Sequence, residues 1–389
     1  MPHKIEELRI VPLDAKLRKQ TQLGAEVLLP TSSPLLDPAS LSASDLETLR
    51  NALFEHGVLV IRDQTGISPN VLPQLARVFD PTARDIHSGG AKQETNKENI
   101  LSQNNCSRIP RAPQVTVIGK GNTNGHEDID DLDLKHLDHT SFHETPLWDE
   151  QIAAGYTRPY RWHMDAPLYE NLPGIATALH SVEVPELPDQ KIMFPTGEEM
   201  EIAAGATAFF SGAKAFDLLT TEEQEFALNT TVQYAPRAYE FIKDCKATDD
   251  GLTIAKLGRE KEQSELTPFE WDKVHSYPMV WRNPATNRPH LQVLGCCVGS
   301  LHTRNAYTGR VDVVDDLAKA RRMVHRMQSR IYRPENIYAH RWRKGDLVVF
   351  HNRGVMHSIT GQLAKHPQRR LLWQCSMASE TWPEAYRPQ

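Results

Sequence analysis

The stretch Arg161-Trp162-His163-Met164-Asp165 is the most informative part of the sequence for the fold. In an extended strand, residues i and i+2 project from the same face. This spacing therefore places the side chains of His163 and Asp165 together, while Met164 packs behind them. The same spacing occurs in His126-Glu127-Asp128, but that segment lies in a polar, glycine-rich stretch that predicts a loop. The first pair is the better candidate for two metal ligands.

A third ligand is expected near the C-terminus. The chain from Gly345 to His357 predicts a strand that runs into a turn, and His357 at its end can complete a set of two histidines and one carboxylate. Such a facial triad is typical of non-haem Fe(II) enzymes and leaves coordination positions open for a co-substrate and O2. His340 and His351 are the competing histidines, and the motif favours His357.

The segment 369–377 predicts a further strand. Its alternation places Arg370, Leu372, Gln374 and Ser376 on one face. An arginine beside a metal site can hold the distal carboxylate of a dicarboxylic co-substrate, because its planar guanidinium forms two parallel charge-assisted hydrogen bonds. The alternative for Arg370 is a solvated or ion-paired surface residue.

Taken together, His163-Met164-Asp165, the segment 351–357 and Arg370 resemble the motifs of Fe(II)/2-oxoglutarate dioxygenases of the taurine dioxygenase (TauD/TfdA) family. The resemblance covers most of the chain and includes the segment 205–211, which looks like the family segment whose threonine helps to hold 2-oxoglutarate. Within the family, residues 153–169 and Gln374-Cys375 look most like the fungal xanthine dioxygenases.

This resemblance implies a mainly β fold, a double-stranded β-helix or jelly roll with helical insertions. It implies that His163, Asp165 and His357 bind Fe(II), that Arg370 and Thr207 bind 2-oxoglutarate, and that O2 is the other co-substrate. The implied activity is hydroxylation of a small polar molecule, with xanthine or a related purine as the leading candidate. The alternatives are an amino acid or specialised metabolite as substrate, a metal-free jelly-roll binding protein, and a zinc hydrolase.

Substrate specificity is expected to depend on Gln374. Taurine dioxygenases carry an arginine at this place, four residues beyond the co-substrate arginine. A neutral amide would leave a sulfonate unpaired at considerable cost, whereas it can pair with an amide edge such as that of a purinedione. The resemblance adds Gln114 and Lys135 as candidate substrate ligands. Ser376 completes the candidate set, at a position where the xanthine enzymes carry an asparagine.

The rest of the chain predicts many short strands and few helices. A helix–strand–helix unit is expected at 43–80, with Ser44 and Glu47 as a capping box, a strand at 58–62, and a second helix capped by Ser68. Further helices are expected at 149–154, 213–228 and 314–331. Further strands are expected at 114–118, 160–164, 175–184, 192–194, 206–210, 279–282, 290–294 and 346–350. We expect one domain spanning 1–389, with core strands from about 156 to 377 and the N-terminal unit as an added layer.

Composition narrows the function classes. The 389 residues carry a formal net charge of −6, which gives no sign of nucleic-acid binding. No apolar run approaches the roughly 18 residues of a membrane span, and the N-terminus lacks a signal-like apolar core, so a cytoplasmic location is expected. Five cysteines without C-x-x-C spacing predict neither disulfides nor zinc. The histidines at 136, 139 and 143 lack a fourth ligand, and Glu150 is expected on a surface helix. The oligomeric state stays open.

Overall fold

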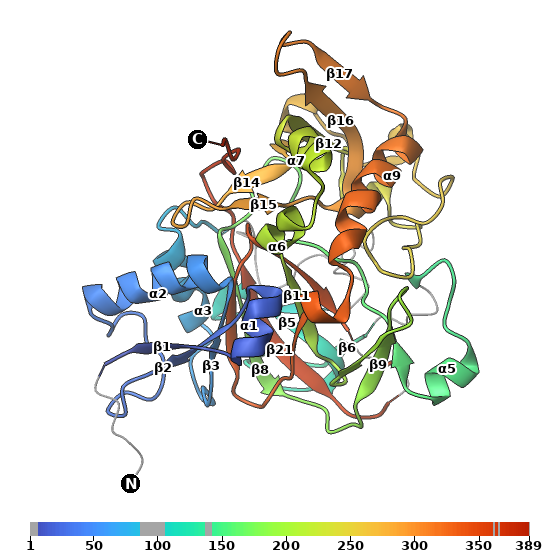
Figure 1. Ribbon diagram of the computed structural model, residues 1–389. Coiled ribbons are helices and arrows are strands. Elements are labelled where there is room, and N and C mark those ends of the chain that lie inside the picture. Colours follow the sequence, from blue (N-terminus) through green and yellow to red (C-terminus); the bar gives the residue numbers. More distant parts are fainter. Residues whose placement is uncertain (1–6, 86–105, 137–141, 361, 365, 389) are drawn as a thin grey trace.

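The computed structural model describes residues 7–85, 106–136, 142–360, 362–364 and 366–388 (Figure 1). Within these residues, the largest sheet has nine strands in the order β1-β2-β3-β19-β8-β21-β5-β4, with β6 paired to β5. Strands from both ends of the chain therefore share one sheet, and we infer that the chain folds as one domain. The strands are β1 (Arg9–Pro12), β2 (Ala25–Leu28), β3 (Val58–Ile61), β4 (Ser107–Ile109), β5 (Ala112–Thr123), β6 (Leu132–Leu134), β8 (Ala176–Glu183), β19 (Leu347–His351) and β21 (Arg370–Ser376).

A smaller sheet, in the order β18-β11-β20, packs against the middle of the large one. Its strands are β18 (Tyr338–His340), β11 (Thr207–Ser211) and β20 (Val355–Ile359). The rings of Phe209 on β11 and Phe350 on β19 lie 5.3 Å apart. They belong to a buried cluster that also contains Leu179 of β8 and Leu372 of β21. Two sheets packed face to face around an apolar core form a sandwich of the kind found in jelly rolls.

Helices and smaller sheets surround this sandwich (Figure 1). Among the described residues, no helix is long and apolar enough to span a membrane. The helices are α1 (Ala15–Thr21), α2 (Ala43–His56), α3 (Val71–Phe79), α5 (Asp149–Ala153), α6 (Gly212–Asp217), α7 (Thr221–Leu228), α8 (Ala238–Phe241) and α9 (Leu317–Gln328). The remaining strands are β7 (Tyr156–Thr157), β9 (Gln190–Met193), β10 (Glu199–Ile202), β12 (Thr230–Tyr234), β13 (Ser276–Pro278), β14 (Val280–Arg282), β15 (Pro289–Leu291), β16 (Val298–Arg304) and β17 (Val311–Val314).

The N-terminal helix–strand–helix unit forms as expected, and its strand β3 lies inside the large sheet beside β19. Helices α2 and α3 cover the outer face of that sheet with leucines that join its buried cluster. The predicted capping box was displaced by two residues. The Ser42 hydroxyl accepts a hydrogen bond from the Asp45 backbone N–H at 3.1 Å, so the helix starts earlier than Ser44 and Glu47 would have placed it. Asn70, rather than Ser68, precedes α3.

Three other predictions about elements were wrong in detail. The predicted helix at 213–228 is two helices, because Thr220 caps α7 by accepting from the Glu223 N–H at 3.3 Å. Residues 160–164 are extended but do not form a regular strand, and within this segment His163 makes an isolated bridge to His357. His357 does not end a turn. It lies inside β20, where it pairs with Phe209 of β11.

Asp346 joins the large and small sheets from the turn before β19. Its carboxylate is 1% exposed and binds Arg62 Nη1 at 2.6 Å, the Arg343 N–H at 2.8 Å and His340 Nε2 at 3.1 Å. Burial alone would raise the pKa of Asp346, but the hydrogen bonds from His340, Arg343 and Arg62 outweigh it and hold the pKa below its usual value. The carboxylate is therefore charged at neutral pH.

We expect Asp346→Asn to lower the free energy of unfolding at pH 7 by about 3–5 kcal/mol, because it removes the buried anion that pairs with the partly buried Arg62. The difference in the free energy of unfolding between variant and wild type should persist down to about pH 4, the ordinary pKa of an aspartate. It should shrink as the pH falls further, through the lower pKa that Asp346 has in the folded state. Urea unfolding at several pH values measures this. Asp312→Asn, in an exposed ion pair with Arg310, is the control and should change stability little. An equal effect of both variants would contradict the assignment.

Candidate metal centre

Three side chains from two distant segments converge at the bridge between His163 and His357. The candidate donor atoms of His163, Asp165 and His357 all lie within 4.8 Å of one another, and no other such group occurs among the described residues. Each imidazole Nε2 is 3.8 Å from Asp165 Oδ1, and the two rings are 4.1 Å apart. The backbone explains this convergence, since His163 and His357 exchange N–H···O bonds of 2.9 and 2.8 Å. Two imidazoles and one carboxylate oxygen form a facial donor set.

Both histidines direct Nε2 toward Asp165 Oδ1. The Nδ1 atom of His163 lies 2.9 Å from the Arg161 carbonyl oxygen, so Nδ1 is the donor to that carbonyl and Nε2 is the nitrogen that faces the other two side chains. Burial and the neighbouring His163 lower the pKa of His357 to about 3. A neutral imidazole can coordinate a metal, whereas an imidazolium cannot.

Asp165 is held in position by three side chains. Its Oδ2 atom accepts from the Thr177 hydroxyl at 2.9 Å and from Gln374 Nε2 at 3.2 Å. Its backbone N–H donates to Asn352 Oδ1 at 2.7 Å, and Asn352 Nδ2 donates back to the Asp165 carbonyl at 2.8 Å. One carboxylate oxygen is therefore fixed by the protein, and the other faces the two imidazoles.

Thr177→Val is expected to weaken Fe(II) binding by roughly 10- to 100-fold, the usual range for groups that orient a metal ligand. The variant keeps the shape of the side chain and removes the hydroxyl that fixes Asp165. Anaerobic Fe(II) titration measures the affinity. Thr231→Val, on β12 at a distance from the site, is the matched control and should leave the affinity unchanged. Equal affinities for Thr177→Val and wild type would show that this hydrogen bond does not orient the carboxylate.

A buried cation lies in the same pocket. Arg370 is 3% exposed, and no carboxylate among the described residues forms an ion pair with it. Its Nε donates to the Gly205 carbonyl at 3.0 Å. Burial lowers the pKa of Arg370 to about 10, so it stays charged at neutral pH. A buried unpaired charge is costly, and the arrangement therefore fits an anionic ligand.

Thr207 lines the same pocket as Arg370. Its hydroxyl oxygen accepts from Trp342 Nε1 at 3.1 Å, which leaves the hydroxyl proton available for a ligand. Gly205, with φ +77°, allows the close approach of Arg370, because a Cβ there would lie 2.9 Å from Arg370 Cδ. The pocket therefore offers a cation and a hydroxyl donor to the distal carboxylate of the 2-oxoglutarate that the resemblance predicts.

The pocket that joins these groups has a volume of about 120 Å³. Lys135 and Gln374, two of the four candidate substrate residues, line it, together with His136 and Tyr160. The other two candidates, Gln114 and Ser376, do not line it. Ser376 pairs with Thr177 at the far end of β21, and Gln114 precedes the stretch of β5 that pairs with β21.

The competing histidines have other partners. His126 Nε2 accepts from Trp373 Nε1 at 2.9 Å. His340 contacts Tyr338 and Asp346, and His351 is buried against Phe54. Of the cluster near residue 140, His143 contacts the Pro159 carbonyl, and His139 lies outside the described residues. Glu150 is exposed on α5, as expected.

Sequence reasoning missed Thr177 and Asn352 as partners of Asp165. Asn352 directly follows a strand of the motif 345–357, so its place beside a candidate ligand was a usable signal. Thr177 is a single threonine at the start of a buried strand, and its partner lies twelve residues earlier in a segment without regular structure. No pattern in the sequence distinguishes it from any other strand threonine.

The sequence matches one protein family and is similar to several proteins of known activity. The chain matches the family described as taurine catabolism dioxygenase TauD, TfdA family over residues 14–376. It is 38% identical to an alpha-ketoglutarate-dependent xanthine dioxygenase of Emericella nidulans, covering 90% of this chain and 93% of that one. It is 36% identical to the enzyme of the same description from Schizosaccharomyces pombe, covering 90% and 84%.

The fold is also similar to solved structures. A putative alpha-ketoglutarate-dependent taurine dioxygenase from Burkholderia xenovorans superimposes with a TM-score of 0.55 at 16% identity, covering 97% of this chain and 91% of that one. The expected fold class, mainly β with a jelly-roll core and helices, is confirmed.

Proposed function

This chain belongs to the TauD/TfdA family of 2-oxoglutarate-dependent dioxygenases, and on that premise we propose that it hydroxylates xanthine at the site described above. His163, Asp165 and His357 hold the Fe(II) that the family uses. Arg370 and Thr207 bind the distal carboxylate of 2-oxoglutarate (alpha-ketoglutarate). The observation that carries the proposal is the combination of a facial donor set with a buried arginine that has no carboxylate partner among the described residues.

The side chains have distinct tasks in this proposal. The iron supplies the activation of O2, coupled to oxidative decarboxylation of 2-oxoglutarate to succinate and CO2, which amino-acid side chains cannot supply. Arg370 and Thr207 fix one end of the co-substrate, so that its keto-acid end is directed toward the metal ligands. Ile118, Leu179 and Leu372 line the same pocket, and their apolar surfaces keep water from the reacting groups.

Xanthine suits the polar groups of this pocket. Gln374 donates one amide hydrogen to Asp165 Oδ2. Its other amide hydrogen and its carbonyl oxygen remain available for the amide edge of a purinedione. Lys135, which lines the same pocket, can donate to a ring carbonyl or stabilise an anionic purine. Xanthine has a single C–H bond, at C8, so its hydroxylation can yield only urate. The names of the relatives support the same substrate.

A succinate-release screen tests this proposal. Wild-type protein with Fe(II), 2-oxoglutarate and O2 should release succinate fastest with xanthine, compared with hypoxanthine, a panel of amino acids, and taurine. Preference for an amino acid or another metabolite would favour the alternative substrate class. Turnover of taurine but not xanthine would overturn the role given to Gln374. If no compound stimulates release and no slow uncoupled succinate forms, the whole assignment fails.

We further propose that the enzyme works in the cytosol on a small molecule. All five cysteines lie in the described part of the chain, and none is joined in a disulfide, which is the usual condition of proteins in a reducing compartment. This supports the location without depending on the substrate.

A further inference from the structure

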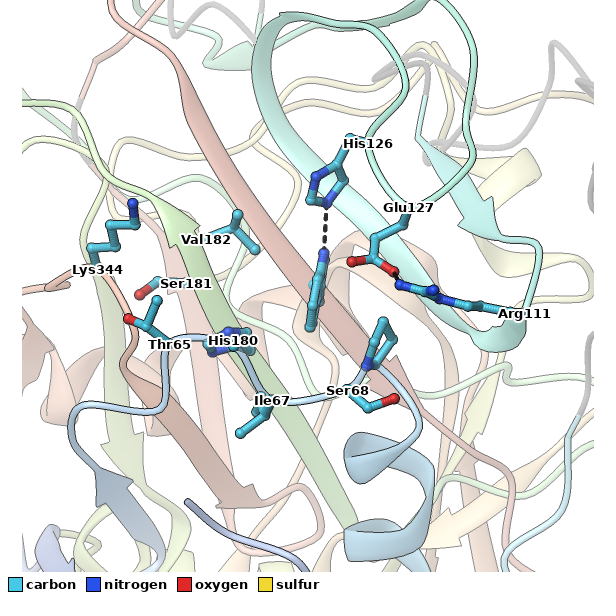
Figure 2. A pocket seen from close by; sticks show the side chains of 13 residues that line it. Thr65, Ile67, Ser68, Arg111, His126, Glu127, His180, Ser181, Val182 and Lys344 are labelled. Atoms are coloured by element: carbon cyan, nitrogen blue, oxygen red, sulfur yellow. Dashed lines mark hydrogen bonds and ion pairs between the residues drawn. The ribbon is translucent and has the colours of Figure 1, made fainter. Parts of the chain in front are cut away.

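A second cavity, of about 500 Å³, is shown in Figure 2. The lining residues place it on the opposite face of the large sheet from the metal centre. It is larger than the pocket that holds the proposed active site. The loop before α3, the turn before β19 and the loops at both ends of β5 form its rim. Strands β8 and β21 form its floor.

The two cavities share strands but not side chains. Along β8, Leu179 lines the metal pocket and His180 lines the second cavity. Along β21, Leu372 and Gln374 line the metal pocket, and Trp373 lines the second cavity. This alternation follows from the two-residue repeat of a strand. The proposed dioxygenase reaction therefore uses none of the groups in the second cavity.

His180 is the buried polar group in the floor. It is 3% exposed, and burial lowers its pKa to about 4, so the ring is neutral at pH 7. Its Nδ1 lies 3.3 Å from the carbonyl oxygen of Asp346, which places the proton on Nδ1. The other nitrogen, Nε2, has no hydrogen-bond partner in the described part of the chain. The floor therefore offers one unused acceptor to a ligand that carries a donor.

The indole of Trp373 packs against His180, and the ring of His126 packs against Trp373 in turn. The ring of Trp373 lies 5.0 Å from that of His180 and 5.9 Å from that of His126. Trp373 Nε1 donates to His126 Nε2 at 2.9 Å, a bond drawn in Figure 2. These rings hold one another in place, and such walls favour a planar ligand.

The rim carries a net positive charge. Arg111 forms an ion pair with Glu127, so these two cancel. Lys344 lies at the opposite side of the cavity (Figure 2) and forms no ion pair with a carboxylate of the described residues. One uncompensated cation at the mouth of an aromatic cavity attracts an anion.

We propose that this cavity is a second binding site, which takes a small planar aromatic anion carrying a hydrogen-bond donor. The ring of the ligand packs against the aromatic wall, its donor meets His180 Nε2, and its anionic group faces Lys344. Such a ligand binds without contacting the metal centre.

Calorimetric titration of full-length protein with 4-hydroxybenzoate tests the site. Wild type should bind one equivalent, and benzoate, which lacks the donor, should bind more weakly. Lys344→Glu should weaken 4-hydroxybenzoate binding by about tenfold, because it reverses the charge that faces the anion. Lys319→Glu makes the same charge change on α9, outside the cavity, and should leave the affinity unchanged. His180→Phe should remove the preference for 4-hydroxybenzoate over benzoate.

The metal pocket must be excluded as the place of binding, since Arg370 could also hold a carboxylate. Arg370→Met should therefore bind 4-hydroxybenzoate as tightly as wild type. Loss of binding in Arg370→Met, with no effect of Lys344→Glu, would place the ligand at the metal centre and overturn the proposal. Absence of binding to wild type at millimolar concentration would overturn it as well. If His180→Phe fails to fold, the Lys344→Glu and Arg370→Met variants still show whether the ligand binds in the second cavity or at the metal centre.

Discussion

Loss of Fe(II) binding by more than about 100-fold is the expected result of His357→Ala, because even residues that only orient a metal ligand contribute 10- to 100-fold. His357 is buried inside β20, and its Nε2 lies 3.8 Å from Asp165 Oδ1. Removal of the imidazole leaves two donors, which cannot hold the metal in a facial arrangement. Xanthine-dependent succinate release should fall with the metal.

The measurement is a visible absorption spectrum under anaerobic conditions. Wild type with Fe(II) and 2-oxoglutarate should develop a weak charge-transfer band, and His357→Ala should not. His302→Ala, on β16 away from the pocket, is the control and should keep the band. The competing candidates for the third ligand, His340 and His351, are tested in the same way. A band that survives in His357→Ala but disappears in His340→Ala or His351→Ala would refute the ligand assignment.

Arg370→Met should raise the KM for 2-oxoglutarate by roughly 30- to 4000-fold. This range corresponds to the 2–5 kcal/mol lost when one partner of a buried, hydrogen-bonded charge pair is removed. Methionine fills similar space and places no charge beside Gly205 and Thr207. The effect should fall mainly on KM, because the arginine holds the distal carboxylate and does not contact the reacting end.

Initial rates over a range of 2-oxoglutarate concentrations measure this effect. Arg369→Met is the matched control, since Arg369 lies on the other face of the strand in an exposed ion pair with Glu183 at 2.9 Å, and its KM should change little. Wild type should also prefer 2-oxoglutarate strongly over 2-oxobutanoate, which lacks the distal carboxylate, and Arg370→Met should lose this preference. A preserved preference would mean that another group binds the carboxylate.

Much of the fold could be predicted from short-range patterns. The apolar run of β3 and the alternation along β21 marked their strands, because a buried strand and a two-faced strand each have a characteristic repeat. The pairing of His163 with His357 could not be predicted in detail. It depends on an isolated bridge between a segment without regular structure and the middle of β20.

Substrate residues were harder to predict than the candidate metal ligands. The metal ligands are chemically distinctive, so a few residue types at the right spacing suffice. Gln114 was chosen from the resemblance to the xanthine dioxygenases, and Ser376 from its place on the same strand face as Arg370. Their distance from the pocket lining depends on where β5 and β21 begin and end their pairing. Gln374 was expected to contact the substrate, and in the structure its amide also holds Asp165. Such shared use of one side chain appears only in three dimensions.

The most direct test of the account is the ratio of products formed from xanthine by wild-type protein. With Fe(II), O2 and 2-oxoglutarate, urate and succinate should accumulate in equal amounts, and both should depend on every component. In 18O2, one labelled oxygen atom should enter each product. Urate that forms without 2-oxoglutarate, or whose new oxygen comes from water, would contradict the proposed dioxygenase reaction on xanthine.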